Sequence, residues 1–339
     1  MTRDHFDRPL RSLRLSVTDR CNLRCGYCMP EETYTWLPKP ELLTFEEAAA
    51  LVGALAPLGV DRVRLTGGEP LLRRNLPDLV ARLSGLGTLE DLALTTNAVR
   101  LDDFAAPLAA AGLGRITVSL DTLRADRFRH LTRRDELGNA LRGIDAAAEA
   151  GFRGTKINAV VVRHENDDEL VDLLAFARER DLEMRFIEYM DVGGATRWSM
   201  DAVVSAAEML RRIGDALGTP EPIEPARTSA PADHFRLPDG QVFGIIASTT
   251  RPFCSGCDRA RLTADGRFFT CLYAREGTAL TPVLRQDGVD AAARLVSETW
   301  AGRRDRGAEE RLAEAERAPL AQPDELRNAP HLEMHTRGG

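Results

Sequence analysis

The residues of this chain best suited to chemistry are its six cysteines, which fall into two groups of three. The first group, Cys21, Cys25 and Cys28, has the spacing C-x3-C-x2-C and follows a short apolar run. A structural zinc site takes four protein ligands, and an electron-transfer [4Fe–4S] cluster takes four cysteines. Three thiolates would instead leave one iron of a [4Fe–4S] cluster open to an external ligand.

S-adenosylmethionine can chelate an open iron through its amino and carboxylate groups, and an electron from the cluster can then break the sulfonium C–S bond. The turn Gly67-Gly68-Glu69-Pro70 fits this chemistry, because paired glycines at a strand end let the backbone approach a ligand closely. A zinc site completed by a distant residue is one alternative for the triad. Disulfides are another, which a reducing compartment disfavours.

The second group, Cys254, Cys257 and Cys271, again has three members. The nearest upstream histidine is His234, and a zinc site completed by it is the alternative here. A cluster that only relays electrons does not need an open iron, whereas a cluster that binds a substrate does. The second group therefore predicts a second [4Fe–4S] cluster with a substrate beside it.

Basic residues on the expected strands indicate the charge of that substrate. Arg259 and Arg261 alternate with apolar neighbours, so both guanidiniums face one side of a strand; a solvated charged face is the ordinary explanation. However, four further strands carry a cation, and charges inside a barrel must be paired. A triphosphate would pair them, since guanidinium forks match phosphate oxygens. The four strand cations are Arg14, Arg64, Lys156 and Arg185.

Short apolar runs alternate with helical patterns over the first two-thirds of the chain. They predict strands at 12–17, 62–66, 91–95, 116–120, 156–162 and 182–189, and helices at 44–58, 76–86, 101–111, 139–150 and 168–180. This alternation predicts an α/β fold with a parallel sheet covered by helices. The glycine-rich loop of a doubly wound dinucleotide fold is absent and a cysteine triad stands in its place, which favours an incomplete (β/α)6-type TIM-like barrel.

The pattern changes in the last third of the chain. A helix is expected at 201–217, a Pro-rich loop at 218–232, strands at 235–237 and 242–247, and a hairpin turn at Asp265-Gly266. We therefore expect a barrel over 1–225 and a smaller C-terminal α+β extension over 226–302 that carries the second cluster. Residues 303–339, rich in Arg, Glu, Ala and Pro at 303–329, predict a flexible tail.

The composition limits the partners that this protein can have. Its 339 residues carry a net charge of −7, so its overall field would not draw it to nucleic acid or to an anionic membrane. The N-terminus lacks the apolar segment of a signal peptide, and no apolar run approaches the roughly 18 residues of a membrane span. We expect a cytoplasmic protein with reduced thiols and with neither a nucleic-acid nor a membrane partner.

Taken together, the motifs closely resemble the molybdenum cofactor biosynthesis protein A family, the GTP 3′,8-cyclases of the radical S-adenosylmethionine superfamily. The resemblance covers most of the chain and reaches Gly338-Gly339, since the family ends in a Gly-Gly tail that enters the active site. The matching segments are LRLSVTDRCNLRCGYCMP (13–30), VRLTGGEPLLRRNL (63–76), LTTN (94–97), ITVSLDTL (116–123), KINAVVV (156–162), MRFIEYMDVG (184–193) and CSGCDRARLTADGRFFTCL (254–272).

The resemblance implies a reaction and a role for each group of residues. One [4Fe–4S] cluster binds S-adenosylmethionine through Cys21, Cys25 and Cys28, and a second, on Cys254, Cys257 and Cys271, binds the guanine. A 5′-deoxyadenosyl radical takes hydrogen from ribose C3′ of GTP, and the ribose closes on C8 to give (8S)-3′,8-cyclo-7,8-dihydroguanosine 5′-triphosphate, in the first step of molybdenum cofactor biosynthesis. The implied S-adenosylmethionine contacts are Tyr27, Gly68, Ser119 and Met190. The implied GTP contacts are Arg14, Arg64, Thr95, Lys156, Arg185, Arg259 and Arg261, and the implied catalytic residues are Arg259, Arg261, Gly338 and Gly339.

The resemblance also implies partners. They are a cyclic pyranopterin monophosphate synthase that takes the product, a reductant such as flavodoxin or ferredoxin, and a second copy in a homodimer. Two positions depart from the family pattern, with Ala98 where glycine is usual and Asp258 where asparagine is common. The alternatives are another radical enzyme with an auxiliary cluster, for instance one that modifies peptides, and an iron–sulfur or zinc regulatory protein without turnover.

Overall fold

The structure is a computed structural model that describes residues 1–224 and 229–338. Its strands are β1 (Ser12–Ser16), β2 (Arg62–Thr66), β3 (Asp91–Thr96), β4 (Arg115–Ser119), β5 (Lys156–Val161), β6 (Glu183–Glu188), β7 (Glu221–Ile223), β8 (Asp233–Arg236), β9 (Val242–Ile246), β10 (Arg259–Leu262), β11 (Arg267–Phe269) and β12 (Thr278–Ala279). Its helices are α1 (Phe45–Leu55), α2 (Leu76–Ser84), α3 (Leu101–Ala110), α4 (Ala125–Thr132), α5 (Leu137–Glu149), α6 (Leu170–Glu179), α7 (Ala206–Leu217), α8 (Thr281–Asp287), α9 (Val289–Ala301), α10 (Gly307–Leu312), α11 (Pro323–Asn328) and α12 (Met334–Arg337).

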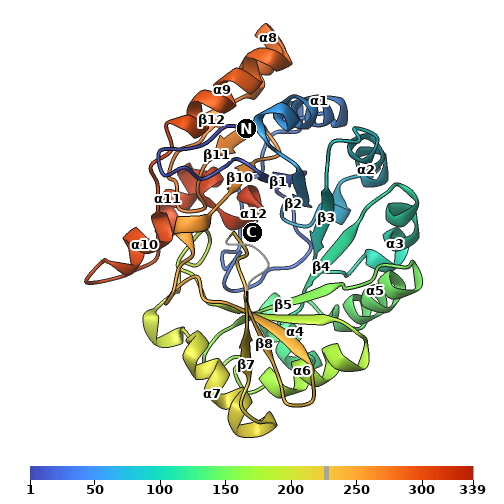
Figure 1. The fold of residues 1–339 in the computed structure, drawn as a ribbon, viewed down its shortest axis with the longest axis vertical. Helices are drawn as coiled ribbons and strands as arrows, with labels where there is room; N and C mark the ends of the chain where they lie inside the picture. Colours follow the sequence, from blue (N-terminus) through green and yellow to red (C-terminus); the bar gives the residue numbers. More distant parts are fainter. Residues whose placement is uncertain (225–228, 339) are drawn as a thin grey trace.

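The strands form one curved sheet in the order β12-β11-β10-β1-β2-β3-β4-β5-β6-β9-β8-β7. Every neighbouring pair from β10 through β1–β6 to β9 is parallel, and the strands beyond them are antiparallel. Figure 1 shows the sheet curving around a centre in which the C-terminus lies, with the helices outside. No pairing joins β9 to β10 among the described residues, so the predicted incomplete barrel is confirmed.

The predicted elements of the barrel agree with the structure, because each strand alternates between an apolar outer face and a polar inner face. Each of the six predicted barrel strands is present to within one residue at either end. Leu13 and Leu15 of β1 are fully buried under the helices, while Arg14 between them points inward. A capping box begins α1, with the Thr44 hydroxyl accepting from the amide of Glu47 at 3.1 Å. Helix α4 was not predicted from the sequence.

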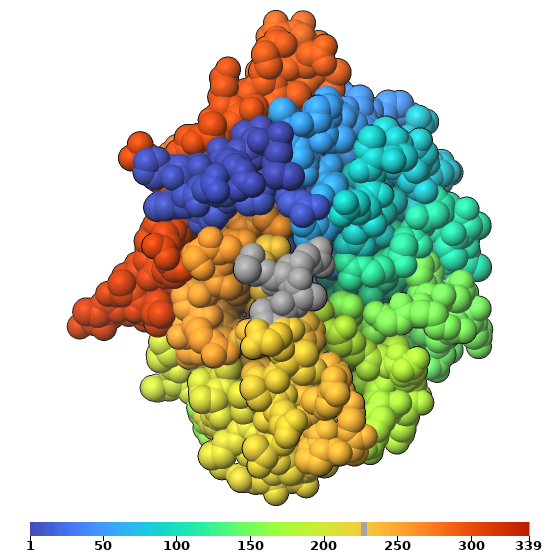
Figure 2. All heavy atoms as spheres, in the orientation of Figure 1, coloured from blue at the N-terminus to red at the C-terminus, as the bar shows by residue number. Residues whose placement is uncertain are grey.

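The C-terminal part does not form a separate sheet. β9 pairs with β6 and β10 pairs with β1, so residues of the expected extension complete both edges of the barrel sheet. β7 lies inside the stretch that was expected to be a loop. Figure 2 shows the dark blue N-terminal residues lying against the orange-red C-terminal helices, where the indole of Trp300 donates to the carbonyl of Arg8 at 3.1 Å. The boundary at residue 225 stays a prediction.

The expectation of a flexible tail is wrong for the described part of 303–338. α10, α11 and α12 lie in this stretch, and Leu326 and Leu332 are buried with Ala321 in a small apolar cluster. Arg303 is 4% exposed and stacks on Trp300. The sequence pattern missed this order because the anchors are mainly arginines that bind carbonyls and carboxylates on distant segments, and such partners leave no local periodicity. No helix in the described ranges is both long and apolar enough to span a bilayer.

Candidate active site

The first cysteine triad lies in the loop that follows β1, at the carboxyl end of the barrel strands. All three thiols are substantially buried, and burial raises the pKa of Cys21 to about 11. Burial, the carboxylate of Asp121 and the other two thiols raise the pKa of Cys25 well above its usual range. The three sulfurs therefore lie close enough for their charges to interact. A turn holds this loop, with the amide of Cys28 donating to the carbonyl of Cys25 at 3.0 Å.

The predicted Gly-Gly turn packs directly against the chain that leads into this triad. Gly67 has a φ of 151°, and a Cβ there would lie 2.3 Å from the carbonyl oxygen of Thr18. A Cβ on Gly68 would lie 2.4 Å from the carbonyl oxygen of Arg20. Any side chain would therefore push the turn away from the cysteine loop. The structure shows why two glycines are required here, and the expected contact of Gly68 with S-adenosylmethionine stays a prediction.

Glu69 anchors this turn, a role that the sequence did not reveal. Its side chain is buried and accepts from the Thr96 hydroxyl at 2.7 Å and from the Asn97 amide at 2.8 Å, both at the end of β3. Burial raises the pKa of Glu69 to about 7, although these hydrogen bonds oppose the shift. Glu69 therefore joins the ends of β2 and β3 beside the first triad.

The other predicted S-adenosylmethionine residues are spread around the opening. The hydroxyl of Tyr27 donates to Asp121 at 2.7 Å, and burial raises the pKa of Asp121 to about 6. Ser119 is at the end of β4, beside Asn158 of β5. Met190 packs in a different place, in an apolar cluster that includes Cys254 and Cys271. Tyr27 thus lies within the loop of the first triad, whereas Met190 lies near the second triad.

The second triad is formed by two segments that the fold brings together. Cys254 and Cys257 flank a turn before β10, and Cys271 follows β11. Arg8 donates to the carbonyl of Cys254 and Arg303 to the carbonyl of Cys257, each at 2.9 Å. Although burial opposes it, the neighbouring arginines, including Arg303, lower the pKa of Cys257. Cys257 of the second triad therefore lies beside cations, whereas the carboxylate of Asp121 lies beside Cys25 of the first triad.

Three arginines form a row across the inner face of the barrel. Arg14 of β1 is in register with Arg261 of β10 on one side and with Arg64 of β2 on the other. Neighbouring strands are about 4.8 Å apart, so the guanidiniums lie side by side. Burial and the nearby cations Arg261 and Arg64 lower the pKa of Arg14 well below its usual range. Within the described residues, none of the three forms an ion pair with a carboxylate, so this row is a candidate anion site.

Among the residues that the structure describes, the hydrogen-bond partners of this row are all neutral. Arg64 donates to the hydroxyls of Thr95 at 3.2 Å and Thr117 at 3.0 Å. Burial lowers its pKa to about 10. Arg261 is likewise buried, and its pKa is also lowered to about 10. Arg259, the other predicted arginine of β10, stacks on Phe253 at 4.5 Å and leaves one buried nitrogen without a partner.

Lys156 and Arg185 differ from this row because the chain itself supplies their counter-ion. The carboxylate of Glu183 lies 3.0 Å from the Lys156 ammonium and 2.5 Å from the Arg185 Nε. Although burial opposes ionisation, the hydrogen bond from His234 and the two cations hold the pKa of Glu183 well below its usual range. Lys156 and Arg185 therefore do not need a polyanion as their only counter-ion, contrary to the expectation from the sequence. Glu183 could have been found from the sequence, since it lies two residues before Arg185 and shares its face.

The C-terminal segment enters the barrel, as the resemblance implied. The carbonyl of Gly338 accepts from Arg14 at 3.3 Å and from Arg261 at 2.5 Å. Gly338 has a φ of 70°, and a Cβ would lie 2.3 Å from Thr66, so only glycine fits. Gly339 lies outside the described residues. The expected catalytic role of this pair stays a prediction.

The two positions that depart from the family pattern each have a structural consequence. Ala98 has a φ of 61°, in the left-handed region where glycine is unstrained and a methyl group is not. The buried carboxylate of Asp258 lies 3.4 Å from Arg62, which neutralises it. Asp258 therefore does not place an unpaired negative charge beside the arginine row.

The donor sets fit two [4Fe–4S] clusters. Each triad brings together three thiols, none of which forms a disulfide. Burial favours the neutral thiol over the thiolate, and bound iron would stabilise the thiolates because it supplies positive charge. Each thiolate of such a cluster binds a different iron. Among the described residues, no three His, Cys, Asp or Glu side chains surround a position for one metal ion.

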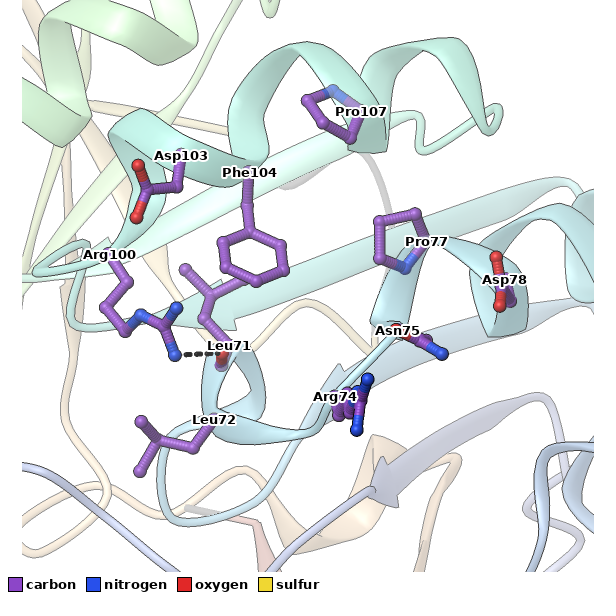
Figure 3. Close-up of a pocket in the computed structure, with 10 residues that line it drawn as sticks. All are labelled: Leu71, Leu72, Arg74, Asn75, Pro77, Asp78, Arg100, Asp103, Phe104 and Pro107. Carbon is purple, nitrogen blue, oxygen red and sulfur yellow. Dashed lines mark hydrogen bonds between the residues drawn. The ribbon is translucent and has the colours of Figure 1, made fainter.

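A cavity of about 510 Å³ lies outside the barrel, between the start of α2 and α3 (Figure 3). Phe104 and Pro107 of α3 face Pro77, and the guanidinium of Arg100 donates to the carbonyl of Leu71 at 3.4 Å. None of the predicted site residues lines this cavity, so it belongs to the outer surface and not to the site.

The barrel and the first triad define a radical S-adenosylmethionine enzyme. Residues 15–177 match the Radical SAM superfamily, and residues 182–309 match Molybdenum Cofactor Synthesis C. GTP 3′,8-cyclase 3 of Mycobacterium bovis is 51% identical over 342 residues, which cover 99% of this chain and 90% of that protein. GTP 3′,8-cyclase of Aquifex aeolicus is 44% identical over 312 residues, covering 91% of this chain and 94% of that protein. The chain belongs to the GTP 3′,8-cyclase family.

A solved structure supports the fold. Streptococcus suis SuiB bound to S-adenosylmethionine superimposes with a TM-score of 0.57 at 16% identity, over 85% of this chain and 68% of that chain. At this identity the similarity shows the barrel architecture alone. The family's cofactors are two [4Fe–4S] clusters and S-adenosylmethionine, which the two triads fit.

Proposed function

We propose that this chain converts GTP to (8S)-3′,8-cyclo-7,8-dihydroguanosine 5′-triphosphate, the first step of molybdenum cofactor biosynthesis. The row of Arg14, Arg64 and Arg261 carries the proposal, because none of its members forms an ion pair with a carboxylate of the described residues and because Arg261 lies beside the second triad. Buried cations without counter-ions need an anionic ligand. A nucleoside triphosphate supplies that charge, and its base can reach the second cluster.

Within this proposal, Cys21, Cys25 and Cys28 hold the first cluster, which when bound supplies the electron that cleaves S-adenosylmethionine into methionine and the 5′-deoxyadenosyl radical. One side of the cofactor site is formed by Tyr27 and Ser119. The hydroxyl of Tyr27 is held by its hydrogen bond to Asp121. The close packing of Gly68 leaves backbone groups as the only contacts that this turn can offer. These residues bind and orient the cofactor and exclude water from it.

Cys254, Cys257 and Cys271 would hold the second cluster, which would supply a binding position for the guanine. Arg259 and Arg261 stabilise the triphosphate from the β10 side, and Arg14 and Arg64 do so from the neighbouring strands. Thr95 orients Arg64 through its hydroxyl. Lys156 and Arg185 reach the substrate as a pair whose net charge Glu183 reduces. Gly338 occupies the end of the arginine row, where its carbonyl meets Arg14 and Arg261.

The partners follow from the product and from the electron that the reaction consumes. The product passes to a cyclic pyranopterin monophosphate synthase, and a flavodoxin or ferredoxin supplies the electron in the cytoplasm. The working assembly is a homodimer, with the barrel over 1–225, the cluster-bearing extension over 226–302 and the C-terminal segment over 303–339. Neither a nucleic acid nor a membrane takes part.

An anaerobic assay tests the proposal. Reconstituted protein with GTP, S-adenosylmethionine and dithionite is expected to produce 5′-deoxyadenosine together with an equal amount of cyclised GTP, measured by mass spectrometry. ATP in place of GTP is the control and is expected to give no cyclised product. Iron and sulfide analysis is expected to find about eight irons per chain, as two cubane clusters require. Formation of 5′-deoxyadenosine without loss of GTP would overturn the substrate assignment, and bound zinc would overturn the cluster assignment.

A further inference from the structure

Arg337, in the last turn before Gly338, is one of the largest fully buried side chains of the described protein, with 1% of its surface exposed. Its Nη1 donates to the carbonyl of Leu272 at 2.7 Å and its Nε donates to the carbonyl of His331 at 2.5 Å. The guanidinium also stacks on Phe269, with 4.3 Å between Cζ and the ring centroid. The remaining nitrogen, Nη2, is buried and has no partner.

No carboxylate forms an ion pair with Arg337 within the described residues. Burial and the neighbouring cation Arg261 lower the pKa of Arg337 to about 9, and only the thiol of Cys271 acts in the opposite direction. A buried guanidinium without a counter-ion is costly, and two neutral carbonyls do not compensate its charge. The group that can do so is the second cysteine triad, one residue from the carbonyl that Arg337 contacts.

The backbone of the same residue is linked to the arginine row. Arg261 donates to the carbonyl of Arg337 at 3.1 Å and to that of Gly338 at 2.5 Å. The position of the Arg337 side chain therefore determines where Gly338 lies. The chain thus connects the second triad to the anion site through a single buried arginine.

We propose that Arg337 latches the C-terminal segment to the second cluster. The negative charge of the cluster and its three thiolates is the counter-ion that keeps this guanidinium buried, so that residues 331–338 dock in the barrel when that cluster is assembled. The inference rests on the proposed function only for the presence of the second cluster. It makes Arg337 a positioning residue, because it acts on the substrate site through Gly338 and Arg261.

Hydrogen–deuterium exchange of the C-terminal peptide tests the latch on the full, anaerobically reconstituted chain without GTP, with iron measured on every sample. Arg337→Gln is expected to exchange the amides of 331–338 about tenfold faster than the unaltered chain, the usual effect of losing a hydrogen bond to a charged group. Arg337→Lys keeps the charge, and its amides 331–338 are expected to exchange at a rate between those of Arg337→Gln and the unaltered chain. Cys271→Ser and Cys257→Ser, which both remove the second cluster, are expected to match Arg337→Gln. Cys21→Ser removes the first cluster and is expected to stay protected.

Two results would overturn the latch. One is a C-terminal peptide that stays protected in both second-triad variants, since the carbonyls and Phe269 would then be sufficient to hold Arg337. The other is normal protection in Arg337→Gln. The measurement is independent of turnover, so a protein that shows the expected exchange but leaves GTP unchanged would refute the proposed function and not the latch.

Discussion

Asp191 offers the sharpest test of how the C-terminal segment is attached to the barrel. It follows the end of β6, and its carboxylate is fully buried. Arg317 donates to its two oxygens at 2.9 and 2.7 Å, Arg311 donates at 2.7 Å and the hydroxyl of Tyr273 donates at 3.0 Å. The carboxylate of Asp191 therefore joins the barrel to the loop of the second triad, to α10 and to the segment after α10. Replacing it by asparagine keeps the shape and removes the charge.

The magnitude follows from burial. The side chain of Arg317 is 4% exposed and that of Arg311 is 14% exposed, so neither guanidinium can turn to water when the charge is lost. Breaking a buried ion pair in this way costs about 3–5 kcal/mol of the free energy of unfolding. An asparagine amide would also point two N–H groups at arginine donors. We expect Asp191→Asn to lose about 3–5 kcal/mol.

Chemical denaturation of the cluster-free, reduced protein measures this loss, with the slope of the transition checked for each variant. Asp215→Asn is the matched control, because the ion pair of Asp215 with Arg211 has a similar distance of 2.9 Å but side chains 67% and 64% exposed. This exposed pair is expected to contribute less than about 1 kcal/mol. Limited proteolysis is expected to cut 303–338 faster in Asp191→Asn alone. Equal stability of the two variants would refute the view that burial gives this network its strength.

Three further predictions concern the anion site, the C-terminus and pH. Arg64→Met is expected to raise the KM for GTP about tenfold or more, because it removes a charged partner of the substrate; an unchanged KM in steady-state assays would contradict the arginine row. Deletion of Gly338 and Gly339 is expected to lower turnover at least about tenfold while moving the denaturation midpoint little, since the described contacts of Gly338 that are lost are hydrogen bonds to its carbonyl; turnover equal to that of the full chain would argue against a role for the tail. The ion pairs of Glu183 lower its pKa although burial opposes this, so their contribution to stability is present above the unfolded pKa of about 4.3 and is lost as the pH falls through the lower folded pKa. The stability deficit of Glu183→Gln, measured by denaturation, is therefore expected to be largest near pH 7 and to shrink below about pH 4; a deficit that is the same at both would contradict this assignment.

Much of the barrel could be predicted because its signals are local. The alternation of Leu13, Arg14 and Leu15 already shows which side of β1 faces inward, since side chains on a strand alternate strictly. The cysteine spacings likewise show three ligands twice, whatever the fold around them. Glu69 was missed because a carboxylate in a turn reveals neither its burial nor the strand end that it binds.

The sequence by itself determined the chemistry of this protein: two triads of thiols, a Gly-Gly turn beside the first and cations on inward strand positions. Only the tertiary structure decided which of those cations lack a counter-ion. Glu183 forms ion pairs with both Lys156 and Arg185 and reduces their charge, whereas the register of β10 with β1 joins Arg261 to Arg14. The strand register and the burial of Arg337 depend on contacts between residues that are far apart in the chain. The free energies of these contacts depend on the exclusion of water, which a local sequence pattern does not predict.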